Sequence, residues 1–313
     1  HYYKRSCFVN SKRPPILLSG LILGLFGLGN LLLNYHSIFF HFLNGLALIL
    51  WLYLTLALVL SFSDYRQDLQ KAPFLSSFAT YPMASMLLAS YLSKLGLFLV
   101  SQFLWYMALL LHIVLIAIFT WKYVLKAEGL SLTPSWTVLY VGLAMASLTQ
   151  GVVHQLLLGY LAWFFALLLS LILYPLFYRA RWSQRLPDAL KPQWAIYCAP
   201  FSLLLGSYIR LAGSDAEGWF VALLLLLSQA FYLLVLCLLP RIFRLGPQLS
   251  WSALTFPLVN TAFALKLGLD YLGWTWLVWL SHAEALLAFA IVLYVCFYYT
   301  VSLRARKITK NPR

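Results

Sequence analysis

An acidic residue in the middle of an apolar stretch is the first candidate for chemistry in this chain. Glu284 lies ten residues after Trp274, which is about 15 Å along a helix that rises about 1.5 Å per residue, and so near the middle of a bilayer. Ionisable groups at that depth are unfavourable and usually serve a function, here that of an intramembrane proton site. The alternative is a protonated or hydrogen-bonded structural group, paired for example with Asn260 at similar depth.

An aromatic residue directly before a proline is the second candidate. Phe256 precedes Pro257, and Tyr81 precedes Pro82 in a matching tetrapeptide, Thr-Phe-Pro-Leu against Thr-Tyr-Pro-Met. A proline inside a helix removes a backbone hydrogen bond and kinks the helix, and a hydrophobic constriction can close a pore by excluding water. Phe256 and Tyr81 are therefore candidate pore-gate residues. The alternative is that both rings pack between helices.

Patterns typical of enzymes and metal sites do not occur in the sequence. His41, His112 and His282 lie in separate apolar stretches, and no pair of the four cysteines has metal-ligand spacing. There is no nucleotide-binding fingerprint, nucleophile elbow, HExxH motif or pair of carboxylates. We therefore predict no catalytic residue, no cofactor and no metal ion, with a membrane enzyme or scaffold as a minor alternative.

Composition indicates the elements that must hold the candidate residues. The chain is 63% hydrophobic and 10% charged, whereas a soluble domain is about 25% charged. Runs such as Gly45–Leu60 and Val221–Leu239 carry no charge and are long enough to approach or exceed a bilayer span. Because these runs do not alternate with polar residues, they predict helices rather than a barrel. We expect an all-α integral membrane protein in which residues 1–313 form one transmembrane domain.

The basic residues indicate how these helices are oriented. Ten spans are expected, and 19 of the 22 Lys and Arg residues fall in the two tails or in the junctions after even-numbered spans. Only Lys94, Arg210 and Lys266 remain for the other side. By the positive-inside rule both termini are cytoplasmic, and the net charge of +14 is topological rather than a sign of nucleic-acid binding. The expected spans are residues 16–33, 38–60, 74–93, 97–121, 135–152, 158–178, 193–210, 219–240, 248–268 and 274–302.

Prolines mark an internal repeat. Five of them open the odd-numbered spans, at separations of 58, 61, 58 and 55 residues, and proline suits the first turn of a helix. A second helix-perturbing residue follows eight to ten residues later in each odd span. The pattern predicts five helical hairpins of about 58 residues, each with one kinked and one straight helix. The opening residues are Pro15, Pro73, Pro134, Pro192 and Pro247, and the kink residues are Gly24, Pro82, Gly142, Pro200 and Pro257.

The two sets of spans differ in chemistry. Ser, Thr and Gly make up 25 of 95 residues in the odd spans and 11 of 120 in the even spans, and no odd span contains Asp or Glu. This favours an inner ring of kinked odd helices around a pore, with Ser85 and Thr255 as candidate lining residues, and an outer ring of even helices facing lipid. The alternative is that small residues only permit close helix packing. Glu284 lies on an even span, which favours its structural role.

Several segments resemble one protein family over essentially the whole chain. They are Trp251–Leu258, which contains Thr-Phe-Pro, Leu190–Trp194 followed by Ala199–Pro200, and Leu132–Trp136. They are similar to the tellurite-resistance/dicarboxylate transporter family, TehA-like and related to the slow anion channel of plant guard cells. The resemblance implies a ten-helix protomer with quasi-fivefold inner helices, a pore in each protomer, a homotrimer, and an occluding aromatic at Phe256. The short tails fit a bacterial member in the inner membrane.

Two functions follow as expectations. The first is a passive channel for small anions, because the odd helices offer hydroxyl groups and no acids to a permeating ion. The second is a proton-linked transporter of C4-dicarboxylates such as malate, of sulfite or of tellurite, because Glu284 could carry a proton and the family is broad. The sequence does not identify the physiological anion.

Overall fold

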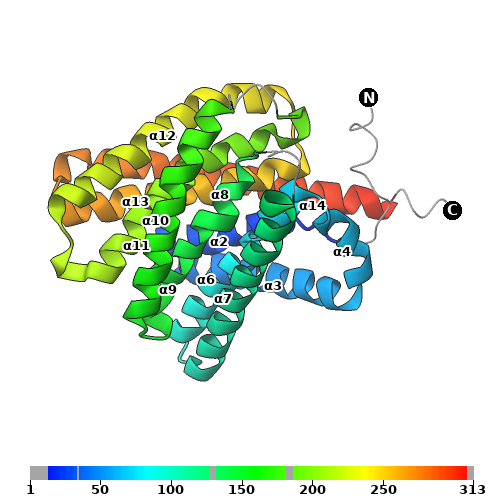
Figure 1. The fold of residues 1–313 in the computed structure, drawn as a ribbon, viewed down its shortest axis with the longest axis horizontal. Coiled ribbons are helices and arrows are strands. Elements are labelled where there is room, and N and C mark those ends of the chain that lie inside the picture. Colours follow the sequence, from blue (N-terminus) through cyan, green and yellow to red (C-terminus); the bar gives the residue numbers. More distant parts are fainter. Residues whose placement is uncertain (1–12, 34, 127–131, 181–185, 309–313) are drawn as a thin grey trace.

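The computed structural model describes residues 13–33, 35–126, 132–180 and 186–308, and throughout these ranges the regular structure is helical (Figure 1). Part of the basic charge that predicts cytoplasmic termini, in residues 1–12, 181–185 and 309–313, lies outside the described residues. The helices of the first half are α2 (Leu18–Leu32), α3 (Ser37–Leu60), α4 (Phe62–Leu69), α5 (Ala72–Ser77), α6 (Thr80–Lys94), α7 (Phe98–Thr120) with the π-turn η1 (Trp121–Leu125), α8 (Ser135–Tyr140), the 3₁₀ turn η2 (Val141–Leu143), α9 (Ala144–Thr149) and η3 (Gln150–Val152).

The second half continues the same pattern of long and short helices. Its elements are α10 (Leu156–Arg179), the 3₁₀ segment η4 (Asp188–Cys198), α11 (Ala199–Ala212), η5 (Gly213–Asp215), α12 (Gly218–Arg244), η6 (Leu249–Trp251), α13 (Ser252–Leu272), η7 (Thr275–Leu277) and α14 (Val278–Ile308). The ends of α3, α7, α10 and α12 agree with the expected spans within four residues, because long uncharged runs define these helices clearly.

Within the described residues, seven helical stretches are long and apolar enough to cross a membrane. Five of them, containing α3, α7, α10, α12 and α14, have only 22 to 39% of their most apolar windows buried inside the protein. Leucine, isoleucine and phenylalanine side chains cover their exposed faces. Such wide apolar surfaces need lipid around them, so the chain is a multi-pass membrane protein.

The remaining helices form the interior of the bundle. The two stretches containing α11 and α13 are 78% buried, and α2, at the centre of the view in Figure 1, buries 12 of its 15 residues. Several inner segments are short or interrupted: α5 and α6 are separate helices, and η2 divides α8 from α9. Breaks of this kind leave backbone groups unpaired, and an interior position lets other helices satisfy them. They also explain why fewer than ten stretches reach span length unbroken.

Close helix crossings hold this interior together. A Cβ atom on Gly20 would lie 3.2 Å from the Ser252 hydroxyl oxygen, and one on Gly24 would overlap Thr255. Thr255 Oγ1 donates a hydrogen bond of 3.0 Å to the carbonyl oxygen of Gly20. The glycines of α2 therefore let its backbone touch α13, which is the usual role of small residues between membrane helices.

Candidate functional site

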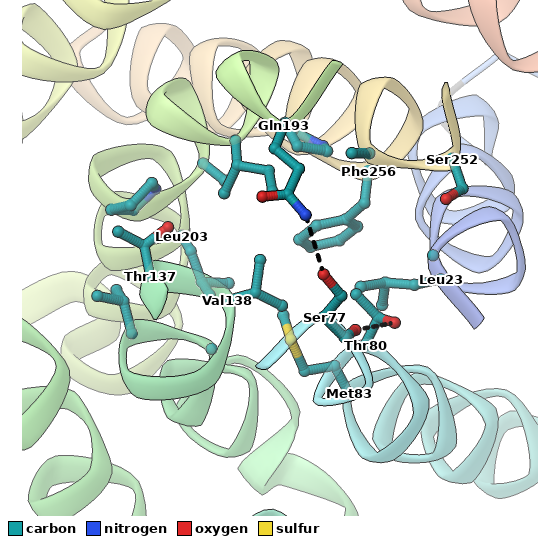
Figure 2. Close-up of a pocket in the computed structure, with 18 of the residues that line it drawn as sticks. Leu23, Ser77, Thr80, Met83, Thr137, Val138, Gln193, Leu203, Ser252 and Phe256 are labelled. Carbon is teal, nitrogen blue, oxygen red and sulfur yellow. Dashed lines mark hydrogen bonds between the residues drawn. The ribbon is translucent and has the colours of Figure 1, made fainter. Parts of the chain in front are cut away.

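A cavity lies where the inner segments begin. Its volume is about 50 Å³, more than the roughly 10–15 Å³ that one water molecule needs. Figure 2 shows its side chains converging from parts of the chain that are far apart in the sequence. None of the described residues in its wall is charged. The wall includes Gly20 and Leu23 of α2, Ser77 of α5, Thr80 and Met83 of α6, Thr137 and Val138 of α8, Gln193 of η4, Leu203 of α11, and Ser252 and Phe256 of α13.

A second cavity lies where the same segments end. Its volume is about 70 Å³, and its wall again takes residues from each inner segment: Asn30 of α2, Lys94 of α6, Thr149 of α9, Arg210 of α11 and Phe263 of α13. The inner segments are α2, α5 with α6, α8 to α9, η4 with α11, and α13. Because early residues of each line the first cavity and later residues line the second, the five segments pass the two cavities in the same direction.

Phe256 belongs to the walls of both cavities. Its side chain is 6% exposed, and in Figure 2 its ring faces the space between α13 and the opposite segments. Gly27 of α2 makes room for the ring, because a Cβ atom there would lie 3.3 Å from Phe256 Cδ2. The phenyl ring therefore borders both cavities, and it offers no polar atom to either of them.

The structure places three other sequence-predicted residues in contacts between helices. Tyr81 stacks on Trp51 of α3, with ring centroids 5.9 Å apart, and its hydroxyl lies 2.7 Å from that of Thr55. Ser85 accepts a hydrogen bond of 2.9 Å from Trp51 Nε1. Thr255 bonds to α2 as described above. None of these three side chains lines either cavity, so Tyr81 does not share the position of Phe256.

The predicted kink residues occupy different backbone settings. Gly142 lies in the 3₁₀ turn η2, Pro200 in the first turn of α11 where η4 ends, and Pro82 in the first turn of α6. Pro257 lies inside α13, whereas α2 continues unbroken through Gly24. Of the five, Gly142, Pro200 and Pro257 line the first cavity.

Glu284 is buried in α14 and lines neither cavity. It is 3% exposed, and the side chain of Gln229 on α12 faces its carboxylate without the geometry of a full hydrogen bond. The amide of Asn260, its predicted partner, instead donates a 2.8 Å hydrogen bond to Ser202 Oγ. Glu284 and its predicted partner are therefore not paired, and of the two only Asn260 lines a cavity.

Most polar residues of the cavity walls were missed by sequence reasoning, and three of them matter most for an anion. Gln193 is 3% exposed, and its Nε2 donates to Ser77 Oγ at 3.3 Å across the first cavity (Figure 2). Its only sequence signal was its place after the span-opening Pro192. Lys94 and Arg210 were noted for their side of the membrane, but nothing in the sequence brings them to the same cavity.

A bundle with lipid-exposed outer helices and two acid-free cavities along its inner segments belongs to the class of membrane channels and transporters. Residues 15–301 match the SLAC1 family model, described as voltage-dependent anion channel. The chain belongs to this family, and the predicted resemblance is confirmed over nearly its whole length. Members of the family transport ions rather than catalyse reactions. No curated protein sequence matches the chain.

Proposed function

We propose that the protein conducts small anions passively along the axis that joins the first cavity, Phe256 and the second cavity. The observation that carries this proposal is that Phe256 lines both cavities, while each cavity draws its wall from all five inner segments. The family supports anions as the permeating species. The finer arrangement that we propose has ten spans in five hairpins, both termini in the cytoplasm and a homotrimer in a bacterial inner membrane.

The chemistry of the walls suits a weakly held anion. The amide of Gln193 has a second N–H beyond its bond to Ser77, and this N–H can replace part of the hydration shell of an anion. The hydroxyl groups of Ser77, Thr80 and Thr137 donate to backbone carbonyl oxygens in this structure, so each donates to an anion only after its O–H rotates towards the cavity. Conduction needs such binding to be weak enough for the ion to leave. Because no carboxylate lines either cavity, no fixed negative charge would attract cations or repel an anion on this path.

Flux into liposomes, measured with and without a pH gradient, tests the proposal. We expect chloride flux to follow the chloride gradient and to be unaffected by a pH gradient. Flux that occurs only with a pH gradient would instead support the proton-linked transporter of C4-dicarboxylates, sulfite or tellurite. No chloride, nitrate or malate flux under either condition would contradict transport through this axis.

Glu284→Gln is expected to leave chloride flux within about twofold of the wild type, a change of about 0.4 kcal/mol in the barrier. The reason is that Glu284 lies outside both cavities and the amide keeps the shape of the side chain. Glu217→Gln, at an exposed acid before α12, is the matched control. Loss of flux in a folded Glu284→Gln protein, but not in the control, would identify Glu284 as a coupling site.

The predicted orientation can be tested across a single inner segment. After replacement of the four native cysteines, Arg179→Cys and Ser214→Cys should react with an impermeant maleimide from opposite sides of the membrane. Both positions are exposed, Arg179 at the end of α10 and Ser214 in η5, and the described residues between α10 and η5 form η4 and α11. Labelling from the same side would show that this segment does not cross the bilayer.

A further inference from the structure

Two cationic side chains face the second cavity without an acidic partner. Lys94 lies in the last turn of α6 and Arg210 in the last turn of α11, and both line the cavity. Lys94 Nζ is 3.5 Å from the amide oxygen of Asn30 and 4.6 Å from the ring centre of Phe40. Arg210 Cζ is 5.9 Å from the ring centre of Phe263. Neither side chain forms an ion pair with a described residue.

Lys266, the third basic residue on the predicted non-cytoplasmic side, has an acidic partner. It pairs with Asp270, with Nζ 3.0 Å from Oδ2, and it does not line the second cavity. The helix dipole alone can favour a cation in a last turn. It does not explain why two helices bring unneutralised cations to one cavity, where like charges repel each other. An anion in that cavity would relieve the repulsion.

We propose that Lys94 and Arg210 form an anion-binding site in the second cavity, where small anions gather before they reach Phe256. The inference rests on the conduction path proposed above and deepens it. The site should favour oxyanions, because a guanidinium group presents paired N–H donors that match two oxygens of one anion. It should also repel cations from this end of the path, which contributes to anion selectivity.

The position of the charges makes the effect directional. Lys94 and Arg210 line the second cavity and not the first, so both charges lie on one side of Phe256. Anions that arrive from this side are concentrated before the constriction, whereas the described wall of the first cavity offers no fixed positive charge beside Phe256. The Debye length is about 10 Å at 0.1 M salt and about 3 Å at 1 M, so the attraction should be strong at low salt and weak at high salt.

Planar-bilayer recording of nitrate currents tests the site, in the wild type and in a Phe256→Ala background. In about 20 mM salt, the Lys94→Gln/Arg210→Gln double variant should lower nitrate conductance from the second-cavity side by about three- to tenfold. In a potassium nitrate gradient, its reversal potential should move towards zero. Lys94→Arg/Arg210→Lys, which keeps both charges, should retain most of the conductance. Lys266→Gln is the matched control and should behave as its parent.

The proposal is overturned if the double variant keeps the conductance, reversal potential and salt dependence of its parent. A second readout does not depend on conduction: at equal ionic strength, sulfate should raise the thermal unfolding midpoint of the wild type and of Lys266→Gln more than that of the double variant, which keeps only the general stabilisation by an excluded salt. Equal stabilisation of all three proteins would also refute the site. If the wild type and Phe256→Ala carry no anion while sulfate still stabilises them through Lys94 and Arg210, the conduction proposal fails and the binding site stands.

Discussion

Phe256→Ala is expected to raise chloride flux at least about tenfold above the wild type in liposomes. The phenyl ring lines both cavities, so we expect its removal to join two spaces that can each hold water. A hydrophobic constriction blocks ions by excluding the water that would hydrate them. Lowering the barrier by only about 1.4 kcal/mol already gives a tenfold increase. Anion selectivity should persist, since the hydroxyl, amide and cationic groups remain.

Phe201→Ala is the matched control for this experiment. Phe201 has the same 6% exposure as Phe256 and also lies on an inner helix, but it packs against Tyr174 and Phe231 and lines neither cavity. Its truncation should lower stability without opening a path. Tyr81→Ala should likewise leave flux unchanged, because its ring stacks on α3. A folded Phe256→Ala protein with wild-type flux, or equal increases in all three variants, would contradict the gate.

The membrane class and the family follow directly from the sequence because they depend on composition and on short motifs. Uncharged runs set the ends of α3 and α10, and the Thr-Phe-Pro segment carries the family resemblance. The leucine-rich spans and the hydroxyl-rich spans also differ in burial. The leucine-rich helices α3 and α10 expose wide apolar faces, whereas the hydroxyl-rich helix α13 is mostly buried. Composition is a sum over residues, and uncharged runs and short motifs are local, so a single sequence is enough to predict the membrane class, the long helices and the family.

The direction in which a side chain points could not be predicted from the sequence, as Tyr81 and Phe256 show. Both follow a threonine and precede a proline, yet one packs between α6 and α3 and the other lines the axis. Pro82 lies in the first turn of α6, whereas Pro257 follows a full turn of α13. Each residue turns a helix by about 100°, so a small difference in how the helix begins rotates an equivalent side chain away from the axis.

The walls of the cavities could not be predicted for a related reason. Lys94 of α6 and Arg210 of α11 line one cavity although they are far apart in the sequence, and Gln193 bonds to Ser77 across 116 residues of sequence. Each wall combines five segments, and no pattern within one segment shows which side chain faces the axis. Charge counting assigns Lys94 and Arg210 to a side of the membrane and leaves their position within it open.

Gly24 shows how one sequence signal can have two physical causes. A glycine inside a span predicts either a perturbed helix or a close crossing. In the structure α2 is continuous at Gly24, and the residue lies against α13. A Cβ atom there would be 2.5 Å from Thr255 Cβ and 3.2 Å from the backbone nitrogen of Phe256. The tight neighbours include backbone, which cannot move aside as a flexible side chain can.

Gly24→Ala is therefore expected to destabilise the protein by about 1–3 kcal/mol, the usual range for overpacking, seen as a lower thermal unfolding midpoint. Gly45→Ala is the matched control, because a Cβ atom on Gly45 of α3 would meet nothing within 4 Å. That control should be neutral or stabilising by up to about 1 kcal/mol through helix propensity. Thr255→Gly should partly rescue Gly24→Ala, since it removes the side chain that the new methyl group strikes, and the non-additivity measures their contact. If the two alanine variants unfold at the same temperature, α2 and α13 do not cross as closely as Gly24 and Thr255 require, and the position of Phe256 on that helix loses its support.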